Sequence, residues 1–406
     1  MKKLNHFMLL TTASLLFLAM PAKSQWTEMN SPVSDALYDI DMTTGNTGYA
    51  AGYYGTFLKS VDGGNNWTAL SVPFTDDLQS VFFFNADSGF VAGNEGLFRT
   101  SDGGQNWTQV VLPDTQSLHH VEFLDAFTGF ATGSSTSIYK TTDGGLSWQK
   151  KNVDTVWWNA IADISFPSVN IGYAVMKGYN THFFKTTDGG ENWFLNDVLP
   201  FCPLTNIEGI HFTSDIRGFF GGWYIGAFYE TNDGGTTWTD PVINGSTTTG
   251  NYYDVDFMNS TTGVMVGYGG DVLITADGGT TWNPELANAG SLPLYAVCFD
   301  DNGTVFSAGD GGKIYRRGAI SSVTESTIAP GFSAYPNPFE TDFIIHFPQM
   351  QNEINIVIYN AVGDKIYDQL FFHSSEIKPE IQMNSGVYFV KIKTENFEQA
   401  GKIIKQ

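Results

Sequence analysis

The residues best suited to chemistry in this sequence stand just before, or at the start of, a series of short apolar runs. They are aromatic rings, a histidine and carboxylates: Tyr38, His119, Trp157, Trp158, Glu208, Tyr253, Asp254 and Tyr295. Aromatic rings beside carboxylates suit the binding of a sugar ring or a peptide. Two carboxylates such as Glu208 and Asp254 could also serve as the acid and base of glycoside hydrolysis. We therefore predict a candidate ligand face, and both binding and hydrolysis stay open.

Other kinds of chemistry find little support in the sequence. No hydrolase motif, phosphate-binding loop or His/Cys metal cluster occurs, so we predict no catalytic residue, no cofactor and no metal site. The formal net charge is −22 with only four arginines, which disfavours nucleic acids and anionic polysaccharides as partners. The two cysteines, Cys202 and Cys298, are expected to be buried free thiols.

One short pattern recurs six times: Ser/Thr, any residue, Asp, Gly, Gly, two further residues, Trp. Its Asp and Trp residues are Asp62, Trp67, Asp102, Trp107, Asp143, Trp148, Asp188, Trp193, Asp233, Trp238, Asp277 and Trp282. The spacing from Asp to Asp is 40 to 45 residues, which is typical of one four-stranded propeller blade per repeat. The Gly-Gly pair favours a tight reversal, and the Asp carboxylate can accept hydrogen bonds from N–H groups of the turn. A pattern repeated once per blade indicates a structural pin rather than six catalytic or metal sites.

The pattern resembles the Asp-box, or bacterial neuraminidase repeat, and the wider repeat resembles the photosystem II assembly-factor family of propellers. The wider repeat is carried by segments such as Gly89-Phe90-Val91-Ala92-Gly93. The resemblance implies a β-propeller with the box away from any active site. A sialidase of this kind would clamp its substrate with three arginines. None of the four arginines, Arg99, Arg217, Arg316 and Arg317, stands at the predicted channel mouth. The basic patch by which the assembly-factor family grips its partner is also missing.

Seven inner strands are predicted from apolar residues that occupy the same position in successive repeats. This apolar column consists of Ile40, Val81, Val121, Ile164, Ile210, Val255 and Val297. The seventh unit has no Asp-box of its own, so its outer strand is missing. Because Trp26 resembles the Trp that opens each strand after a box, we predict that it supplies this strand and closes the ring. The candidate ligand face would then lie at the mouth of the central channel. The alternative there is that the tyrosines and tryptophans plug the mouth and the aspartates cap turns.

The two ends of the chain are predicted to direct its export. Residues 1–24 combine basic, apolar and small-residue regions as a signal peptide does, with cleavage before Gln25 and no transmembrane anchor in the mature chain. After the propeller at 25–320 and a polar linker at 321–333, residues 334–406 predict a small β-sandwich-like domain. The segments Tyr-Pro-Asn-Pro-Phe from Tyr335 and Ser-Gly-Val-Tyr-Phe-Val-Lys-Ile from Ser385 resemble the type A C-terminal sorting domain of the type IX secretion system of Bacteroidota. That resemblance implies the type IX machinery as a partner and export through the periplasm to the medium or the cell surface.

The sequence thus predicts an all-β chain, a seven-bladed β-propeller followed by a small C-terminal domain. We expect a secreted or cell-surface, non-enzymatic protein that binds an extracellular protein or glycan. A glycoside hydrolase with carboxylates at the channel mouth is the alternative.

Overall fold

The structure is a computed structural model of the chain. It describes residues 26–405 except 44, 115–116, 155–158, 178–181, 197–205, 224–227, 245–249, 288, 321–331, 336–338, 340, 361–364, 385 and 396–397. The predicted signal peptide, Cys202, Trp157 and Trp158 therefore lie outside the described residues. The chain divides into two compact units, with the boundary between Ser322 and Val323.

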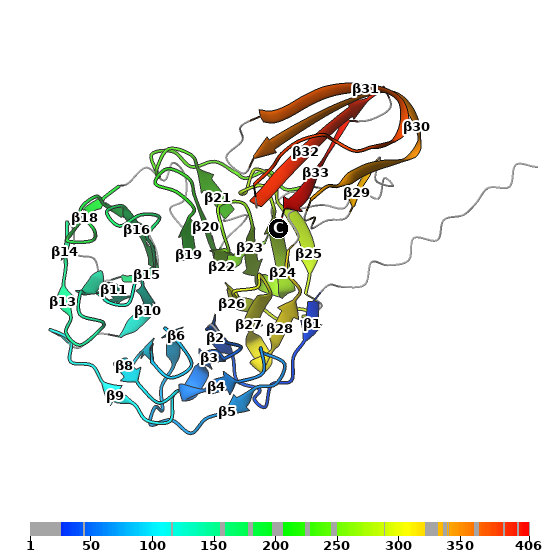
Figure 1. Cartoon of the computed structure of the whole chain (residues 1–406). Coiled ribbons are helices and arrows are strands. Elements are labelled where there is room, and N and C mark those ends of the chain that lie inside the picture. Colours follow the sequence, from blue (N-terminus) through cyan, green and yellow to red (C-terminus); the bar gives the residue numbers. More distant parts are fainter. Residues whose placement is uncertain are drawn as a thin grey trace, which may run out of the picture. The chain divides into compact units, whose positions relative to one another are not determined.

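The described residues of the first unit form seven sheets arranged in a circle, antiparallel except for one added strand (Figure 1). Four of these sheets have four strands each, which follow chain order from the inside outward. The first two contain β2 (Leu37–Met42), β3 (Gly48–Gly52), β4 (Phe57–Ser60) and β5 (Thr68–Ala69), and β6 (Leu78–Phe83), β7 (Gly89–Gly93), β8 (Gly96–Thr100) and β9 (Thr108–Gln109). The other two contain β10 (Leu118–Phe123), β11 (Gly129–Gly133), β12 (Ser137–Thr141) and β13 (Gln149–Lys150), and β22 (Tyr252–Phe257), β23 (Gly263–Gly267), β24 (Asp271–Thr275) and β25 (Asn283–Leu286). The all-β prediction is confirmed, and the blade number of seven stays a prediction with which these sheets agree.

The other sheets vary this plan. One contains β15 (Ala160–Ser165), β16 (Gly172–Lys177), β17 (Phe183–Thr186), β18 (Asn192–Leu195) and an added parallel strand, β14 (Asn152–Val153). Another contains β19 (Asn206–Phe212), β20 (Gly218–Trp223) and β21 (Phe228–Thr231), and its outer edge is reduced to a bridge between Glu230 and Thr239. The last contains β26 (Leu294–Phe299), β27 (Val305–Gly309), β28 (Ile314–Arg317) and β1 (Trp26–Glu28).

The last sheet joins the start of the first unit to its end. β1 pairs antiparallel with β28 and places Trp26 opposite Arg317, as the ring-closure hypothesis expects (Figure 1). Trp26 is 5% exposed, and its indole N–H donates to Glu285 Oε2 at 3.1 Å. Arg317 binds both oxygens of the same carboxylate at 2.9 Å, from Nε and from Nη2. The first strand is therefore fixed both by burial of its ring and by an ion pair that crosses to the neighbouring sheet.

The apolar column read from the sequence lies between the sheets. All seven of its residues are buried, from Ile40 on β2 to Val297 on β26. Their neighbours two residues on, such as Phe83, pack against aromatic rings of the adjacent sheet, here Tyr49 and Phe57. Alternate residues of an inner strand thus form the contact between blades, and the residues between them face the central channel.

Each copy of the Ser/Thr-x-Asp-Gly-Gly-x-x-Trp pattern, called a box below, joins the third strand of a sheet to its outer edge. In the second box, Asp102 Oδ1 accepts from the N–H of Asn106 at 2.9 Å and from the hydroxyl of Thr100 at 2.9 Å, and Oδ2 accepts from the side chain of Asn106. These donors, with Asn106 first, lower the pKa of Asp102 to about 2. The carboxylate is therefore held by the hydrogen bonds of its own turn.

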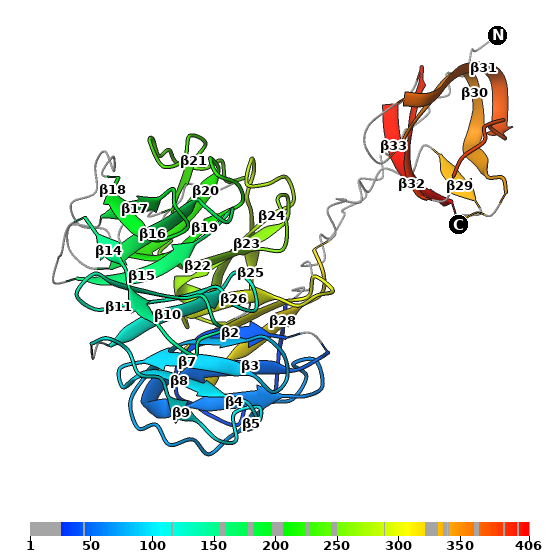
Figure 2. The same cartoon turned by 60° about the vertical axis from the view of Figure 1, so that its left-hand side comes forward.

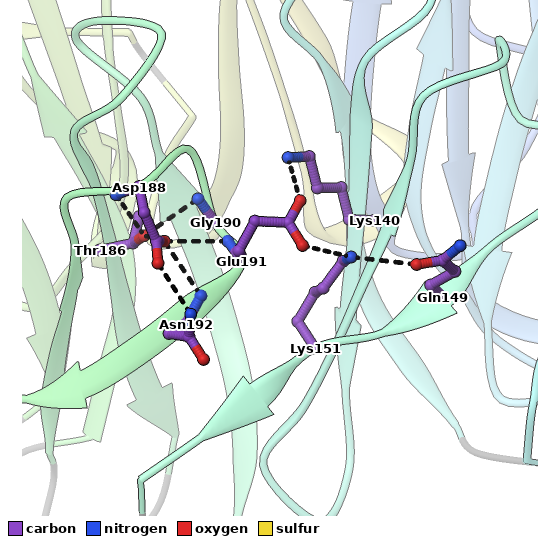
Figure 3. Close-up of polar contacts among 8 residues, drawn as sticks. All are labelled: Lys140, Gln149, Lys151, Thr186, Asp188, Gly190, Glu191 and Asn192. Carbon is purple, nitrogen blue, oxygen red and sulfur yellow. Dashed lines mark hydrogen bonds and ion pairs between the residues drawn. The ribbon is translucent and has the colours of Figure 1, made fainter.

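The boxes also attach one blade to the next. Gly104 has a φ of +86°, and a Cβ built on it would lie 2.7 Å from the ring of Phe57 in the preceding blade. In the fourth box, Glu191 extends from the turn made by Asp188 and accepts from Lys140 at 2.6 Å and Lys151 at 2.8 Å, both in the preceding repeat (Figure 3). The pattern thus serves as a pin within and between blades.

The second unit is a five-stranded sheet (Figure 2). Its strands are β29 (Ser333–Tyr335), β30 (Ile344–Asn360), β31 (Lys365–Ile377), β32 (Gly386–Thr394) and β33 (Glu398–Lys405). β30 pairs with β29, β31 and β32, and Ile354, Ile356 and Ile358 along it are fully buried. The small C-terminal β domain that the sequence predicts is therefore built on one sheet, with β29 paired to β30.

In the described part of the chain, no helix has the length and apolar character needed to cross a membrane.

Candidate functional site

Every inner strand contains a β-bulge at the same position near its start. The pairing of the first and second strands shifts by one residue there, for example between Leu37 and Asp39 and between Tyr252 and Asp254. A bulge adds one unpaired residue and re-aims its side chain. The seven added residues are Tyr38, Gln79, His119, Ala162, Glu208, Tyr253 and Tyr295. All seven line one cavity of about 380 Å³, so the bulges build the walls of the candidate site.

Four aromatic rings form a continuous arc along one side of this cavity. Ring centroids lie 5.7 Å apart for Tyr38 and Tyr295, 5.4 Å for Tyr295 and Tyr253, and 5.5 Å for Tyr253 and Trp223. Tyr253 is buried, whereas Trp223, at the end of β20, is 43% exposed. The arc therefore joins buried and half-buried rings to one exposed ring at its end.

Carboxylates of the residues after the bulges line the same cavity. Asp39 accepts from the N–H of Ile40 at 2.8 Å and, through its other oxygen, from the N–H of Val81 on the next inner strand at 2.7 Å. Asp163 makes the same pair of bonds to Ile164 and Ile210, and Asp254 makes them to Val255 and Val297. Partial burial raises the pKa of Asp39 to about 6 and that of Asp254 well above its ordinary value. These aspartates therefore connect neighbouring blades.

Glu208 and His119 complete the polar lining of the cavity. Glu208 accepts from Lys177 Nζ at 2.7 Å and from Asn206 Nδ2 at 2.6 Å, and burial raises its pKa in spite of Lys177. Burial, with a contribution from Lys177, lowers the pKa of His119 to about 4, so its imidazole is neutral at pH 7. His120 Nδ1 lies 3.4 Å from Asp163 Oδ1.

A second layer of acidic groups lies two residues further along the inner strands. Asp41 accepts from the N–H of Phe83 at 2.6 Å, and Asp256 lies 3.6 Å from His211 Nδ1. Partial burial raises the pKa of Asp41 and of Glu122 to about 7. Among the described residues, no group of three or more His, Cys, Asp or Glu side chains is arranged to hold a metal ion.

The structure brings together six of the eight residues proposed for the ligand face. Tyr38, His119, Glu208, Tyr253, Asp254 and Tyr295 all line the cavity. Trp157 and Trp158 lie outside the described residues, so their predicted place on this face is neither supported nor contradicted.

Sequence reasoning missed Lys177 and Trp223 in this lining. Both stand at the ends of second strands, where the pairing of Lys177 with Ala160 and of Trp223 with Asn206 carries them to the cavity rim. In the sequence, the only indication of these two positions was a lysine or a tryptophan at the end of an otherwise apolar strand.

The arginines contribute to the boundaries between blades. Arg217 Nε donates to the carbonyl of Gly278 in the next box at 2.6 Å, and Arg316 donates to Asn65 in the first box at 2.8 Å. With Arg317 bound to Glu285, these three cations are engaged away from the cavity.

Comparisons with known proteins identify both units. The model of the photosynthesis system II assembly factor YCF48 family matches residues 18–116 and 107–247. The chain belongs to this family. The secretion system C-terminal sorting domain matches residues 333–406. No curated protein sequence matches the chain.

Solved structures support the same fold. A structure of YCF48 bound to D1 peptide has a TM-score of 0.60 at 20% identity, covering 74% of this chain and 99% of that one. YCF48 from Cyanidioschyzon merolae has a TM-score of 0.60 at 22% identity, covering 72% and 98%. A streptogramin B lyase has a TM-score of 0.59 at 15% identity, covering 72% and 96%. The predicted propeller fold is confirmed, and the sorting domain points to secretion or the cell surface.

Proposed function

We propose that this chain is a secreted or cell-surface binding protein without catalytic activity, which takes a protein or glycan ligand into the cavity at the mouth of its propeller. The observation that carries the proposal is the ring of bulges, because it turns seven inner-strand residues into one lining of aromatic and polar groups. A concave site with few, fixed polar groups is the usual form of a binding pocket.

The carboxylates of the cavity support binding rather than hydrolysis. Asp254 accepts backbone N–H groups with both oxygens, as Asp39 does in another blade, so its contacts are those of a repeated structural position. Glu208 is held by Lys177 through one oxygen and by Asn206 through the other, so both of its oxygens are already engaged. Neither residue therefore has the freedom that an acid–base pair needs.

We propose further that the mature chain reaches its site by an N-terminal signal peptide and then by the type IX machinery acting on residues 334–406. The sorting-domain match supports the second step. Fusing residues 321–406 to a periplasmic reporter tests it. We expect export in a strain with a type IX system, and a reporter retained in the periplasm contradicts the assignment.

A binding experiment with matched variants tests the function. The secreted chain is screened on a glycan array and against purified surface proteins, beside Tyr295→Ala, which breaks the aromatic arc, and Phe372→Ala, an exposed ring of the second unit. We expect one ligand class to bind the wild type and Phe372→Ala, with about tenfold or greater loss for Tyr295→Ala. Hydrolysis of any glycan that disappears in Glu208→Gln would instead establish the glycosidase alternative.

A further inference from the structure

The cavity holds more acidic side chains than its own cations can pair with. Four carboxylates line it, those of Asp39, Asp163, Glu208 and Asp254, and Lys177 is the one lysine or arginine among the described lining residues. Lys177 is already paired with Glu208 at 2.7 Å. The three aspartates are therefore left with backbone N–H groups and a histidine as their nearest positive partners.

The layer beneath adds to this imbalance. Alternate residues of a strand share a face, so Asp41, Asp256 and Glu122 follow the cavity residues into the channel. His211, at 3.6 Å from Asp256, and His120 are the basic side chains that the described inner strands place beside them. Desolvated carboxylates without cations bind protons more strongly, which is the physical reason that the pKa values of Asp41 and Glu122 rise to about 7.

The aromatic arc is suited to the same kind of ligand. The faces of tyrosine and tryptophan rings carry negative electrostatic potential and attract an ammonium or guanidinium group placed over them. Tyr38, Tyr295, Tyr253 and Trp223 form this arc in the same cavity as the carboxylates, with centroids 5.4 to 5.7 Å apart. Aromatic walls and acidic groups thus favour positive charge from two sides.

His120 offers one more acceptor at this site. Its Nδ1 lies 3.4 Å from Asp163 Oδ1, and its Nε2 is a buried atom with no hydrogen-bond partner among the described residues. In a neutral imidazole that donates from Nδ1 to the carboxylate, Nε2 is an acceptor.

We propose that the cavity receives a cationic side chain, the ammonium of a lysine or the guanidinium of an arginine, presented by a protein ligand. This proposal rests on the binding function above and names the chemistry of its ligand. A cationic group would favour the ionised form of these carboxyl groups, whereas a neutral glycan or an anion would not. A cavity of about 380 Å³ holds one long side chain, and the exposed Trp223 at the rim is available to the segment that carries it.

Substitution of Lys177 tests this proposal, because a cationic ligand is expected to bind more tightly when this lysine is removed. Lys177→Met removes the cation of the cavity and frees Glu208, so affinity for a cationic probe should rise about three- to tenfold. Lys378→Met removes an equal charge from the second unit, where Lys378 pairs with Asp342, and should leave affinity unchanged. The probes are acetyl-Gly-Lys-Gly-amide, its arginine analogue and its norleucine analogue, titrated into the full chain by calorimetry and ligand-observed NMR.

Two more measurements complete the test. Trp223→Ala should lower affinity for the cationic probes about three- to tenfold, because the rim ring is lost while the buried lining is retained. Raising the salt concentration should weaken binding of the cationic probes. Thermal melts of both variants confirm that they are folded.

The results separate this proposal from the general binding function. Binding of the lysine and arginine probes but not of the norleucine probe, strengthened by Lys177→Met, supports it. No binding of the cationic probes, or weaker binding in Lys177→Met, overturns it. If a neutral glycan or an acidic protein then binds in a way that Tyr295→Ala abolishes, the binding function stands and the cationic ligand does not.

Discussion

The first strand offers the most direct test of how the propeller holds together. Trp26 is 5% exposed and belongs to a buried cluster with Val272, Leu294 and Tyr315, which come from two neighbouring sheets. Its N–H donates to Glu285, which also holds Arg317. If β1 closes the ring, Trp26→Ala removes a buried ring and leaves a cavity at this junction.

The expected cost follows from this burial. Truncation of a buried tryptophan to alanine costs about 3–5 kcal/mol of the free energy of unfolding. For a unit of about 300 residues the entropy of unfolding is roughly 0.6 kcal/mol/K, so the melting temperature should fall by about 5–8 °C. Trp26→Phe keeps most of the apolar ring and loses the hydrogen bond to Glu285, and should cost about 1–2 kcal/mol.

Differential scanning calorimetry of the full chain measures these effects. Trp223→Ala is the matched control, because this tryptophan is 43% exposed and its loss should lower the melting temperature by less than about 2 °C. A Trp26→Ala variant that melts with the wild type would refute ring closure by the first strand.

Two further predictions concern the channel and the boxes. Partial burial raises the pKa of Asp41 and Glu122 to about 7, so the folded protein keeps protons that the unfolded chain releases near pH 4. The free energy of unfolding, measured by urea unfolding, should therefore fall by about 1–3 kcal/mol as the pH rises from about 4.5 to 7.5. Asp41→Asn should make this dependence on pH weaker. A free energy of unfolding that rises over the same pH range would contradict the prediction. Gly104→Ala should cost about 2–4 kcal/mol, because it combines a φ of +86° with a contact at 2.7 Å to Phe57. Gly269→Ala is the matched control: its φ is +70°, but nothing lies within 4 Å of a Cβ built there, so it should cost only about 1–2 kcal/mol. If urea unfolding gives the same cost for Gly104→Ala and Gly269→Ala, the contact between Gly104 and Phe57 does not contribute to stability.

Much of the fold could be predicted from the sequence because the same turn and strand pattern occurs in repeat after repeat. The Asp-box specifies its own turn: Asp102 finds its donors within four residues, and the glycines permit the left-handed backbone. The apolar column predicted the inner strands, since a period of two selects the buried face. The reduced edge beside Thr239 was not predictable, because that repeat carries a complete box like the others.

The candidate site was only partly predictable. Tyr38, Glu208, Tyr253 and Tyr295 were selected because they precede the apolar column, but their common direction depends on a bulge in each strand. A bulge breaks the two-residue period by one residue, and the residue types alone do not reveal which way the extra side chain turns.

The sequence by itself determined the repeating unit, its turn chemistry, the tail domain and the surplus of acidic residues. The tertiary structure decided which of those acids share one channel, that Lys177 is the lysine at the cavity, and that Trp26 pairs with the far end of the same unit. The reason is the range of the interactions. Turns and strand faces are set by neighbours within a few residues, whereas charge balance and ring closure depend on side chains that lie hundreds of residues apart and meet only when the sheets are assembled in a circle.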